Sequence, residues 1–290
     1  SATSLNGSEQ TAQVTEAPST TPPASPGEGY NVNNVVGVDQ FGRTFDVIGG
    51  ERDGKQVGMF YFLWLGQPLF SGVYDATKIY NEYGEDVLFH ETSDISPEGQ
   101  FHFWGEPLYG YYKSTDIYVI KNHVNQFTAA GIDYIVMDCT NGWMYNDALK
   151  SPMEYITELR QDGWDAPQVV LYIHSLNNKT VREAYNDIYS LTEYKDSWYM
   201  KDGKPVIIAY TDTEKDIAEA SGRGVTDFDV PEYEPLSQEI LDFFYFVEPR
   251  WPDDYLRQGW PQYDPNKDTG YCWIEWTQPL PVRDTSLGAF

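Results

Sequence analysis

The sequence predicts an α/β fold built on a parallel sheet. Segments that are apolar almost throughout alternate with segments of helical periodicity, and such strands are typical of a sheet covered on both faces. A length of 290 residues suits a single barrel of alternating strands and helices. No glycine-rich phosphate loop follows the first strand, which disfavours the rival open, doubly wound sheet. We therefore expect a (β/α)8 barrel of the TIM type.

Six strands are visible along the chain, at 57–64, 132–138, 168–174, 205–210, 242–248 and 271–275. Helices are expected between them, at 114–131, 151–163, 178–191 and 212–220. The first of these helices has Ser114 or Thr115 as its cap and ends at Gly131. Asp202 and Gly203 form a turn that leads into the fourth strand. Because a barrel of this type needs eight strands, we expect it to be incomplete at its C-terminus, through truncation or a divergent end.

Two regions differ in composition. Residues 1–29 are rich in Ser, Thr, Pro, Ala and Glu and contain almost no large apolar side chain, so we expect a disordered linker there. Residues 30–290 are expected to form the barrel domain. Such linkers commonly tether exported bacterial domains, which predicts a secreted or cell-surface protein. The alternative is the disordered tail of a cytoplasmic protein.

The formal net charge of −26 disfavours two classes of partner. A nucleic-acid binder needs positive charge to displace counterions from phosphates, and an anionic membrane surface is disfavoured for the same reason. No segment reaches the eighteen or so apolar residues of a membrane span. Neutral ligands remain, although the acidity also has a simpler explanation, which is solubility. Aromatic residues make up 16% of the chain, and stacking rings together with hydrogen-bonding carboxylates are what neutral sugars require. We therefore expect a neutral carbohydrate partner, and we expect no membrane insertion and a monomeric chain.

Cysteine and histidine usage disfavours a disulfide framework and a catalytic metal, and the acid–base mechanism expected below uses no cofactor. Cys139 and Cys272 each lie in an apolar, strand-like segment, so both are expected to be buried thiols rather than a disulfide framework. The chain has four His, without a closely spaced pair or an HExxH motif, which disfavours a catalytic metal. The absence of a GxSxG motif removes support for a serine hydrolase mechanism.

Polar and aromatic side chains gather where the predicted strands end. In a β/α barrel the active site lies at the carboxyl ends of the strands, so this coincidence across several strands predicts a site there. The residues at or just beyond these ends include Trp64, Asp138, Asn141, His174, Tyr210, Glu248, Trp251, Glu275 and Trp276.

Three carboxylates are candidates for catalysis, in the order Glu275, Glu248 and Asp138. Glycoside cleavage needs two carboxylates across the scissile bond, one of which keeps its proton near neutral pH. Apolar, ring-lined surroundings favour the protonated form. Glu248 and Glu275 are both flanked by rings in the sequence. The structural alternative for each carboxylate is helix capping, turn chemistry or pairing with a basic residue.

Three segments resemble secreted bacterial glycoside hydrolases of the endo-α-mannosidase type and their uncharacterised relatives. They are "MFYFLWLGQ" on the first strand, "FHFWGEPLYGYY" in the loop that follows, and "AAGIDYIVMDCTNG" on the second strand, and "KDGKPVIIAY" matches the family's fourth strand. The resemblance covers roughly 55–210 and implies a (β/α)8 barrel. His102 and Trp104 correspond to a His-Trp pair of the family. The family's glutamate motif is matched only in part, by "WIEWTQP" around Glu275.

The aromatic segment 101–112 is then expected to arch over the barrel mouth as the loop after the first strand. Its rings would stack on sugar faces, and its polar groups would bind hydroxyls. The residues assigned to substrate binding are Trp64, His102, Trp104, Glu106, Tyr109, Tyr111, Asn141, His174, Trp251 and Trp276. The alternative is that 101–112 folds into a minor hydrophobic cluster beside the barrel.

Together these observations predict a glycoside hydrolase that cleaves a neutral poly- or oligosaccharide by carboxylate acid–base catalysis. The alternative of another class is a non-catalytic surface glycan-binding protein on a degenerate hydrolase barrel. A polysaccharide lyase is disfavoured, because only 19 Lys and Arg face 45 Asp and Glu, and lyases use basic groups to neutralise a uronic acid.

Overall fold

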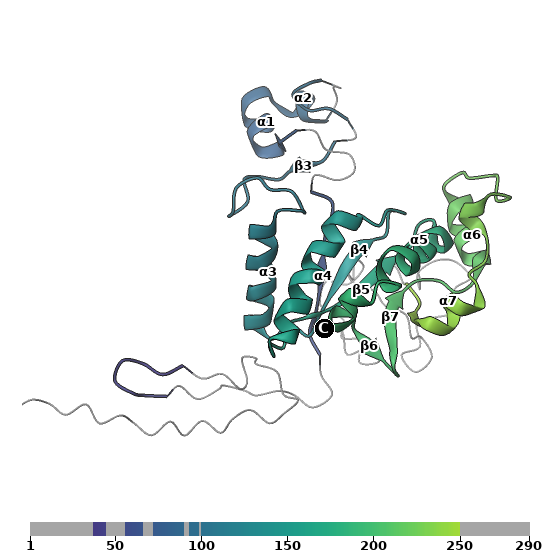
Figure 1. Cartoon of the computed structure of the whole chain (residues 1–290). Helices are drawn as coiled ribbons and strands as arrows, with labels where there is room; N and C mark the ends of the chain where they lie inside the picture. Colours follow the sequence, from purple (N-terminus) through teal and green to yellow (C-terminus); the bar gives the residue numbers. More distant parts are fainter. Residues whose placement is uncertain (1–36, 45–55, 66–71, 90–92, 99, 250–290) are drawn as a thin grey trace, which may run out of the picture.

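The computed structural model describes residues 37–44, 56–65, 72–89, 93–98 and 100–249. Within them, five parallel strands form the main sheet (Figure 1): β1 (Gly58–Tyr61), β4 (Tyr134–Cys139), β5 (Gln168–Ile173), β7 (Lys204–Ile208) and β8 (Tyr245–Val247). These match the first five predicted strands and confirm the parallel α/β sheet. The linker 1–29, the sixth predicted strand 271–275 and Cys272 lie outside the described residues.

The strands lie side by side in the order in which they occur along the chain. β1 pairs with β4, β4 with β5, β5 with β7, and β7 with β8, always in parallel. A doubly wound sheet would reverse its order at a switch point, and the described strands contain no such reversal. The carboxyl ends of all five strands therefore meet at one edge of the sheet.

The two faces of the sheet are covered differently. One face packs against the helices in a large cluster that includes Met137 and Leu171, both fully buried. The opposite face carries a second cluster that is made of strand residues and Tyr199 and includes the buried Val136, Tyr172 and Ile208. The described helices contribute no residue to this second cluster, and "helix-free face" below means this face of the sheet within the described residues. Alternation along each strand assigns odd and even positions to opposite faces.

Four of the helices overlap the four predicted ones. The helices are α3 (Ile117–Ala130), α4 (Asn146–Gln161), α5 (Asn177–Ala184), α6 (Thr213–Gly222) and α7 (Gln238–Phe243), with a π-helical turn at Tyr185–Tyr189, short 3-10 turns at Thr192–Ser197 and Pro231–Tyr233, and strand β6 (Met200–Lys201). However, α4 begins five residues before the predicted start at 151, and α7 was not predicted. Gly131 ends α3 in the left-handed conformation, as expected. Asp202 and Gly203 make the predicted turn between β6 and β7.

Two predicted boundaries are wrong. The cap of α3 is Asp116, whose carboxylate accepts hydrogen bonds from the amides of Tyr118 and Val119. Ser114 instead exchanges hydrogen bonds with the backbone of Leu65 and fixes the chain between β1 and the helix. The fifth strand is shorter than predicted, because Ser237 caps a helix that continues through Phe243.

The segment between β1 and α3 is folded rather than a plain loop. It contains β2 (Tyr74–Asp75), α1 (Ala76–Tyr83), α2 (Glu85–Phe89) and β3 (His102–Phe103), and β2 pairs with β3 in parallel. Figure 1 shows this unit beyond the amino-terminal end of α3. Its position follows from the chain path, since it leaves β1 at the carboxyl end of the strand.

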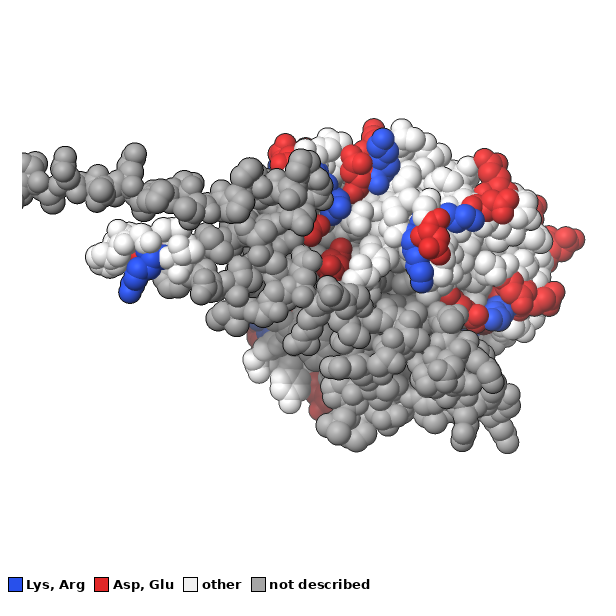
Figure 2. All heavy atoms as spheres, turned by 90° about the horizontal axis from the view of Figure 1, so that it is seen from below, with Lys and Arg blue, Asp and Glu red and all other residues white. Residues whose placement is uncertain are grey.

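The surface agrees with an acidic sequence. On the face that Figure 2 shows, Lys and Arg side chains lie among Asp and Glu side chains rather than in a separate basic patch. Among the helices of the described residues, none combines the length and the apolar character that a bilayer-spanning segment requires.

Replacing Leu171 with Ala is expected to lower the free energy of unfolding by about 3 kcal/mol, because it opens a cavity in the central strand beneath the helices. Chemical denaturation measures the change. Leu108→Ala is the control, since Leu108 is 93% exposed and its truncation should change stability by less than about 0.5 kcal/mol. Equal effects of the two substitutions would contradict the assignment of this core.

Candidate active site

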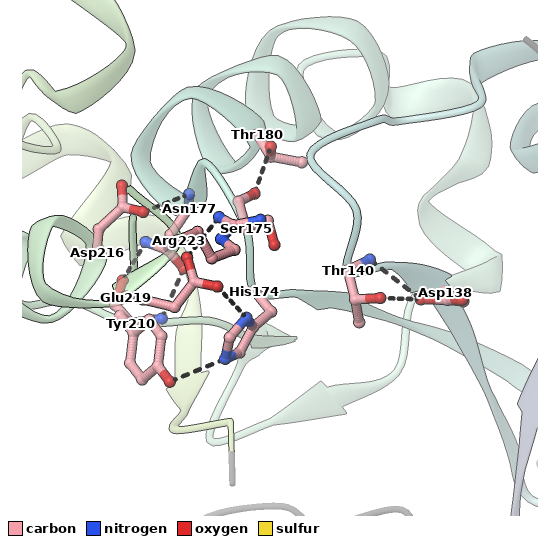
Figure 3. Close-up of polar contacts among 10 residues, drawn as sticks. All are labelled: Asp138, Thr140, His174, Ser175, Asn177, Thr180, Tyr210, Asp216, Glu219 and Arg223. Atoms are coloured by element: carbon pink, nitrogen blue, oxygen red, sulfur yellow. Dashed lines mark hydrogen bonds and ion pairs between the residues drawn. The ribbon is translucent and has the colours of Figure 1, made fainter. Parts of the chain in front are cut away.

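The candidate site lies where β4, β5 and β7 end. Asp138 is the fifth residue of β4 and pairs in register with Tyr172 of β5. His174 directly follows β5, and Tyr210 lies two residues beyond β7. Figure 3 shows two groups of polar contacts at this edge: Asp138 with Thr140, and His174 with Tyr210, Glu219 and Arg223.

Asp138 is a buried carboxylate with a defined set of donors. Its side chain is on the face without helices, in line with Val136, and the residue is 1% exposed. The Thr140 amide and hydroxyl both donate to Oδ1, at 3.1 and 2.7 Å. Burial raises the pKa of this carboxyl above its ordinary value, and the two Thr140 hydrogen bonds oppose that shift. A carboxyl of this kind holds its proton to higher pH than an exposed Asp.

Trp64 is placed beside this carboxyl. Its indole is close enough to favour the ionised form of Asp138 and so to lower its pKa slightly against the effect of burial. The indole Nε1 atom is buried and makes no hydrogen bond of good geometry within the described part of the chain, so its contact with the carboxylate is weak and poorly aligned. The structure thus brings together two of the predicted residues, Trp64 and Asp138.

His174 and Tyr210 form the second group. The imidazole Nε2 is 3.3 Å from the Tyr210 hydroxyl, and Nδ1 is 3.5 Å from Glu219 Oε1. The Glu219 Oε2 atom accepts a hydrogen bond from Arg223 at 2.6 Å. Burial raises the pKa of Glu219, and the positive charge of Arg223 opposes the rise.

The frame of this group consists of residues that the sequence analysis missed. Asp216 is fully buried and accepts the amides of Asn177 and Asn178, both at 3.0 Å. Burial raises the pKa of Asp216, while these amides and two arginines oppose the shift. A signal was present in the sequence: Asp216, Glu219 and Arg223 recur at helical spacing beside Ala220, so acidic groups share the buried face of α6.

Glu248 is bonded differently from Asp138. Val247 belongs to the helix-free face, so the side chain of the next residue, Glu248, is directed to the opposite face. The Glu248 carboxylate forms an ion pair with Lys215 of α6. The Lys215 ammonium also lies 5.9 Å from the centre of the Tyr210 ring. This pairing with a basic residue is the structural alternative named for Glu248, and a catalytic role for it stays a prediction.

Three residues of the aromatic segment make contacts within their own unit. The Tyr111 hydroxyl donates to Asp75, and the Lys78 ammonium contacts both Tyr111 Oη at 2.7 Å and Glu106 at 3.2 Å. His102 stacks on Tyr74 with ring centres 5.3 Å apart, and its Nε2 is 3.0 Å from the Ser96 hydroxyl. These contacts hold the segment against α1. This arrangement agrees with the alternative in which 101–112 folds into a minor cluster of its own.

The remaining rings of the segment differ in exposure. Trp104 is 91% exposed, while its carbonyl accepts a hydrogen bond from the Thr77 hydroxyl. Tyr109 accepts a hydrogen bond from Gln126 of α3 at 2.5 Å, and its ring lies 5.9 Å from that of His123. Trp104 is therefore an exposed ring on an anchored backbone, whereas Tyr109 packs against α3.

Asn141 is exposed in the turn after β4, and its amide lowers the pKa of the Tyr145 hydroxyl against the larger, opposite effect of burial. The predicted residues Trp251, Glu275 and Trp276 lie outside the described residues. Cys139 is a free, fully buried thiol, which confirms the expectation for this residue. The described residues contain no group of three or more His, Cys, Asp or Glu arranged to hold a metal ion.

Comparison with known proteins gives distant structural likeness alone. No family model matches the sequence. No curated protein matches it. Two solved structures of the GH99 endo-alpha-mannosidase from Bacteroides thetaiotaomicron, one of them in complex with Bis-Tris propane, each share 17% identity with a TM-score of 0.34. They align with 67% of this chain and with 52% and 55% of their own.

A structure titled as a glycoside hydrolase-like protein shares 15% identity over 69% of this chain and 54% of its own, with a TM-score of 0.29. The chain thus spans about half the length of the solved structures that it matches. These structures are of the type that the sequence resembles, but TM-scores below 0.5 do not fix the fold of this chain.

The raised pKa of Asp138 predicts a pH-dependent stability difference between the wild type and Asp138→Asn. As pH rises above 3.8, the ordinary value, an unfolded chain releases this proton first, so the folded wild type is penalised until the pH passes the raised pKa. The free energy of unfolding of the wild type should therefore fall relative to that of the variant over this window.

Chemical denaturation of both proteins, from below pH 3.8 to neutral pH, measures the difference. Asn can still accept the Thr140 hydrogen bonds, so the substitution removes mainly the ionisable group. Asp162→Asn, at an exposed position after α4, is the control. If the difference in free energy of unfolding between the two proteins does not change with pH, or if the wild type becomes relatively more stable as pH rises, the burial argument is contradicted.

Proposed function

We propose that the chain belongs to a glycoside hydrolase that cleaves a neutral poly- or oligosaccharide by carboxylate acid–base catalysis. The observation that carries this proposal is the buried Asp138, whose pKa is raised at the carboxyl edge of a parallel sheet. An acid for glycoside cleavage must hold its proton near neutral pH, and burial on a helix-free face favours that. Trp64 beside it offers an aromatic surface of the kind that sugars bind.

We further propose that the sheet closes as a β/α barrel. The sequential order of five parallel strands and the helix-free face are features that barrels share. The second carboxylate of the reaction is proposed to be Glu275 or Glu248. The acidic composition supports a neutral carbohydrate, and the Ser/Thr/Pro-rich segment 1–29 supports an exported or cell-surface protein. A monomeric state is part of the proposal.

Asp138→Asn is expected to lower turnover at least about 100-fold on the substrate found by a panel of neutral glycans, because it removes the transferable proton. Binding, measured by calorimetry, should stay within about threefold, since the Asn side chain keeps the shape and an acceptor. Asp162→Asn should leave both unchanged. Glu248→Gln and Glu275→Gln, assayed in parallel, identify the partner carboxylate.

Full turnover by Asp138→Asn would overturn the assignment of Asp138. A parent protein that binds a glycan of the panel but cleaves none would favour a second candidate function, a non-catalytic glycan-binding protein. One observation favours that candidate: Trp104 is almost fully exposed on a backbone that Thr77 anchors, an arrangement suited to binding alone.

Trp104→Ala is expected to weaken glycan binding by about tenfold, the order of one stacking contact, without lowering the melting temperature. The exposed ring packs against little of the protein, so its loss should cost little stability. Trp164→Ala is the matched control, because Trp164 is 42% exposed just before the amino end of β5. Unchanged affinity in Trp104→Ala would remove this ring from the binding surface.

A further inference from the structure

The imidazole of His174 lies between a carboxylate and a phenol. Its Nδ1 atom is 3.5 Å from Glu219 Oε1, and its Nε2 atom is 3.3 Å from the Tyr210 hydroxyl (Figure 3). The side chains of His174 and Glu219 are 8% and 20% exposed. Both neighbours contact a ring nitrogen directly, so both bear on which nitrogen of the imidazole carries the proton.

Glu219 also forms an ion pair with a basic residue, Arg223. Its other carboxylate oxygen, Oε2, accepts a hydrogen bond at 2.6 Å from Arg223, which directly follows α6 as its C-cap residue. The guanidinium favours the ionised carboxylate, which can only accept hydrogen bonds. The group that faces Oε1 must therefore be a donor if the contact is to be favourable.

Hydrogen bonds connect the segments that carry His174 and Glu219, which are the end of β5 and α6. Asn177 exchanges two hydrogen bonds with the backbone of Tyr210, at 2.9 and 2.8 Å. Asp216, one turn before Glu219 on α6, accepts both amides at the start of α5, those of Asn177 and Asn178. These bonds connect the end of β5 with α6 through a buried polar network, so Glu219 is fixed relative to His174.

We propose that Glu219 is a positioning residue that holds His174 as the Nδ1–H tautomer. The Nδ1–H group points at the carboxylate, and the Nε2 lone pair accepts from the Tyr210 hydroxyl. A neutral imidazole has one donor and one acceptor nitrogen, so fixing one fixes the other. The inference rests on the 3.5 Å ion-pair separation between Nδ1 and Oε1 together with the acceptor character of the carboxylate, and needs no substrate. Its use to orient Tyr210 toward a sugar hydroxyl rests on the proposed function.

Long-range ¹H–¹⁵N NMR on protein labelled at its imidazoles tests the proposal without any substrate. The chain has only four His, and the signal lost in His174→Gln assigns the ring. At neutral pH the wild type should show His174 as the Nδ1–H tautomer. Glu219→Ala should shift the ratio of the two tautomers toward Nε2–H by at least about tenfold, the factor for losing a charged hydrogen bond.

Glu219→Gln is the rescue variant, because its amide oxygen also accepts from Nδ1–H and should keep the wild-type tautomer. Glu214→Ala, which removes an exposed carboxylate from the first turn of the same helix, is the matched control and should leave the tautomer ratio unchanged. Circular dichroism establishes that the variants are folded. If Glu219→Ala does not fold, the wild type and Glu219→Gln still decide the question.

Three results would overturn the proposal: an Nε2–H ring or a doubly protonated ring in the wild type at neutral pH, or a tautomer ratio that Glu219→Ala leaves unchanged. None of them depends on turnover. Failure of the glycan screen with the Nδ1–H tautomer present would reject the proposed function and leave the positioning role of Glu219 intact.

Discussion

Parallel pairing in chain order is the constraint on which the rest of the structure depends. Each strand of the main sheet pairs with the next one along the chain, so every strand delivers its last residue to the same edge. The pairing of β4 with β5 runs over six residues, from Tyr134 to Cys139, and both strands are buried on both faces. A shift by one residue would turn Asp138 from the helix-free face toward the helix layer, which is occupied by the large apolar cluster.

Burying polar groups costs free energy, and this constrains the structure at the carboxyl ends of the strands. Asp138 receives two hydrogen bonds from Thr140, and Asp216 receives two backbone amides at the start of α5. Buried carboxylates without such donors would destabilise the fold, so the loops after the strands take conformations that supply them. The same loops carry His174 and Tyr210. The loops that stabilise the buried carboxylates therefore also carry the residues of the candidate site.

The unit between β1 and α3 follows a different principle. Its rings pack on one another and on α3, and the Lys78 ammonium joins Tyr111 and Glu106. The surplus of aromatic residues, which as sequence alone indicates a ligand surface, thus goes in part into a small cluster of its own. Trp104 is the member of the segment whose ring is left almost wholly exposed.

The sequence by itself determined the strand and helix alternation, the parallel sheet and the gathering of polar residues at strand ends. Apolar runs such as that around Val136 specify buried strands, because few other structures bury every side chain of a segment. Tertiary structure alone decided which polar residues meet. It paired Glu248 with Lys215, and it brought Glu219 to His174 across 45 positions of chain. Local patterns set periodicity and burial, whereas contacts between distant side chains depend on strand order, register and helix rotation, which no short segment encodes.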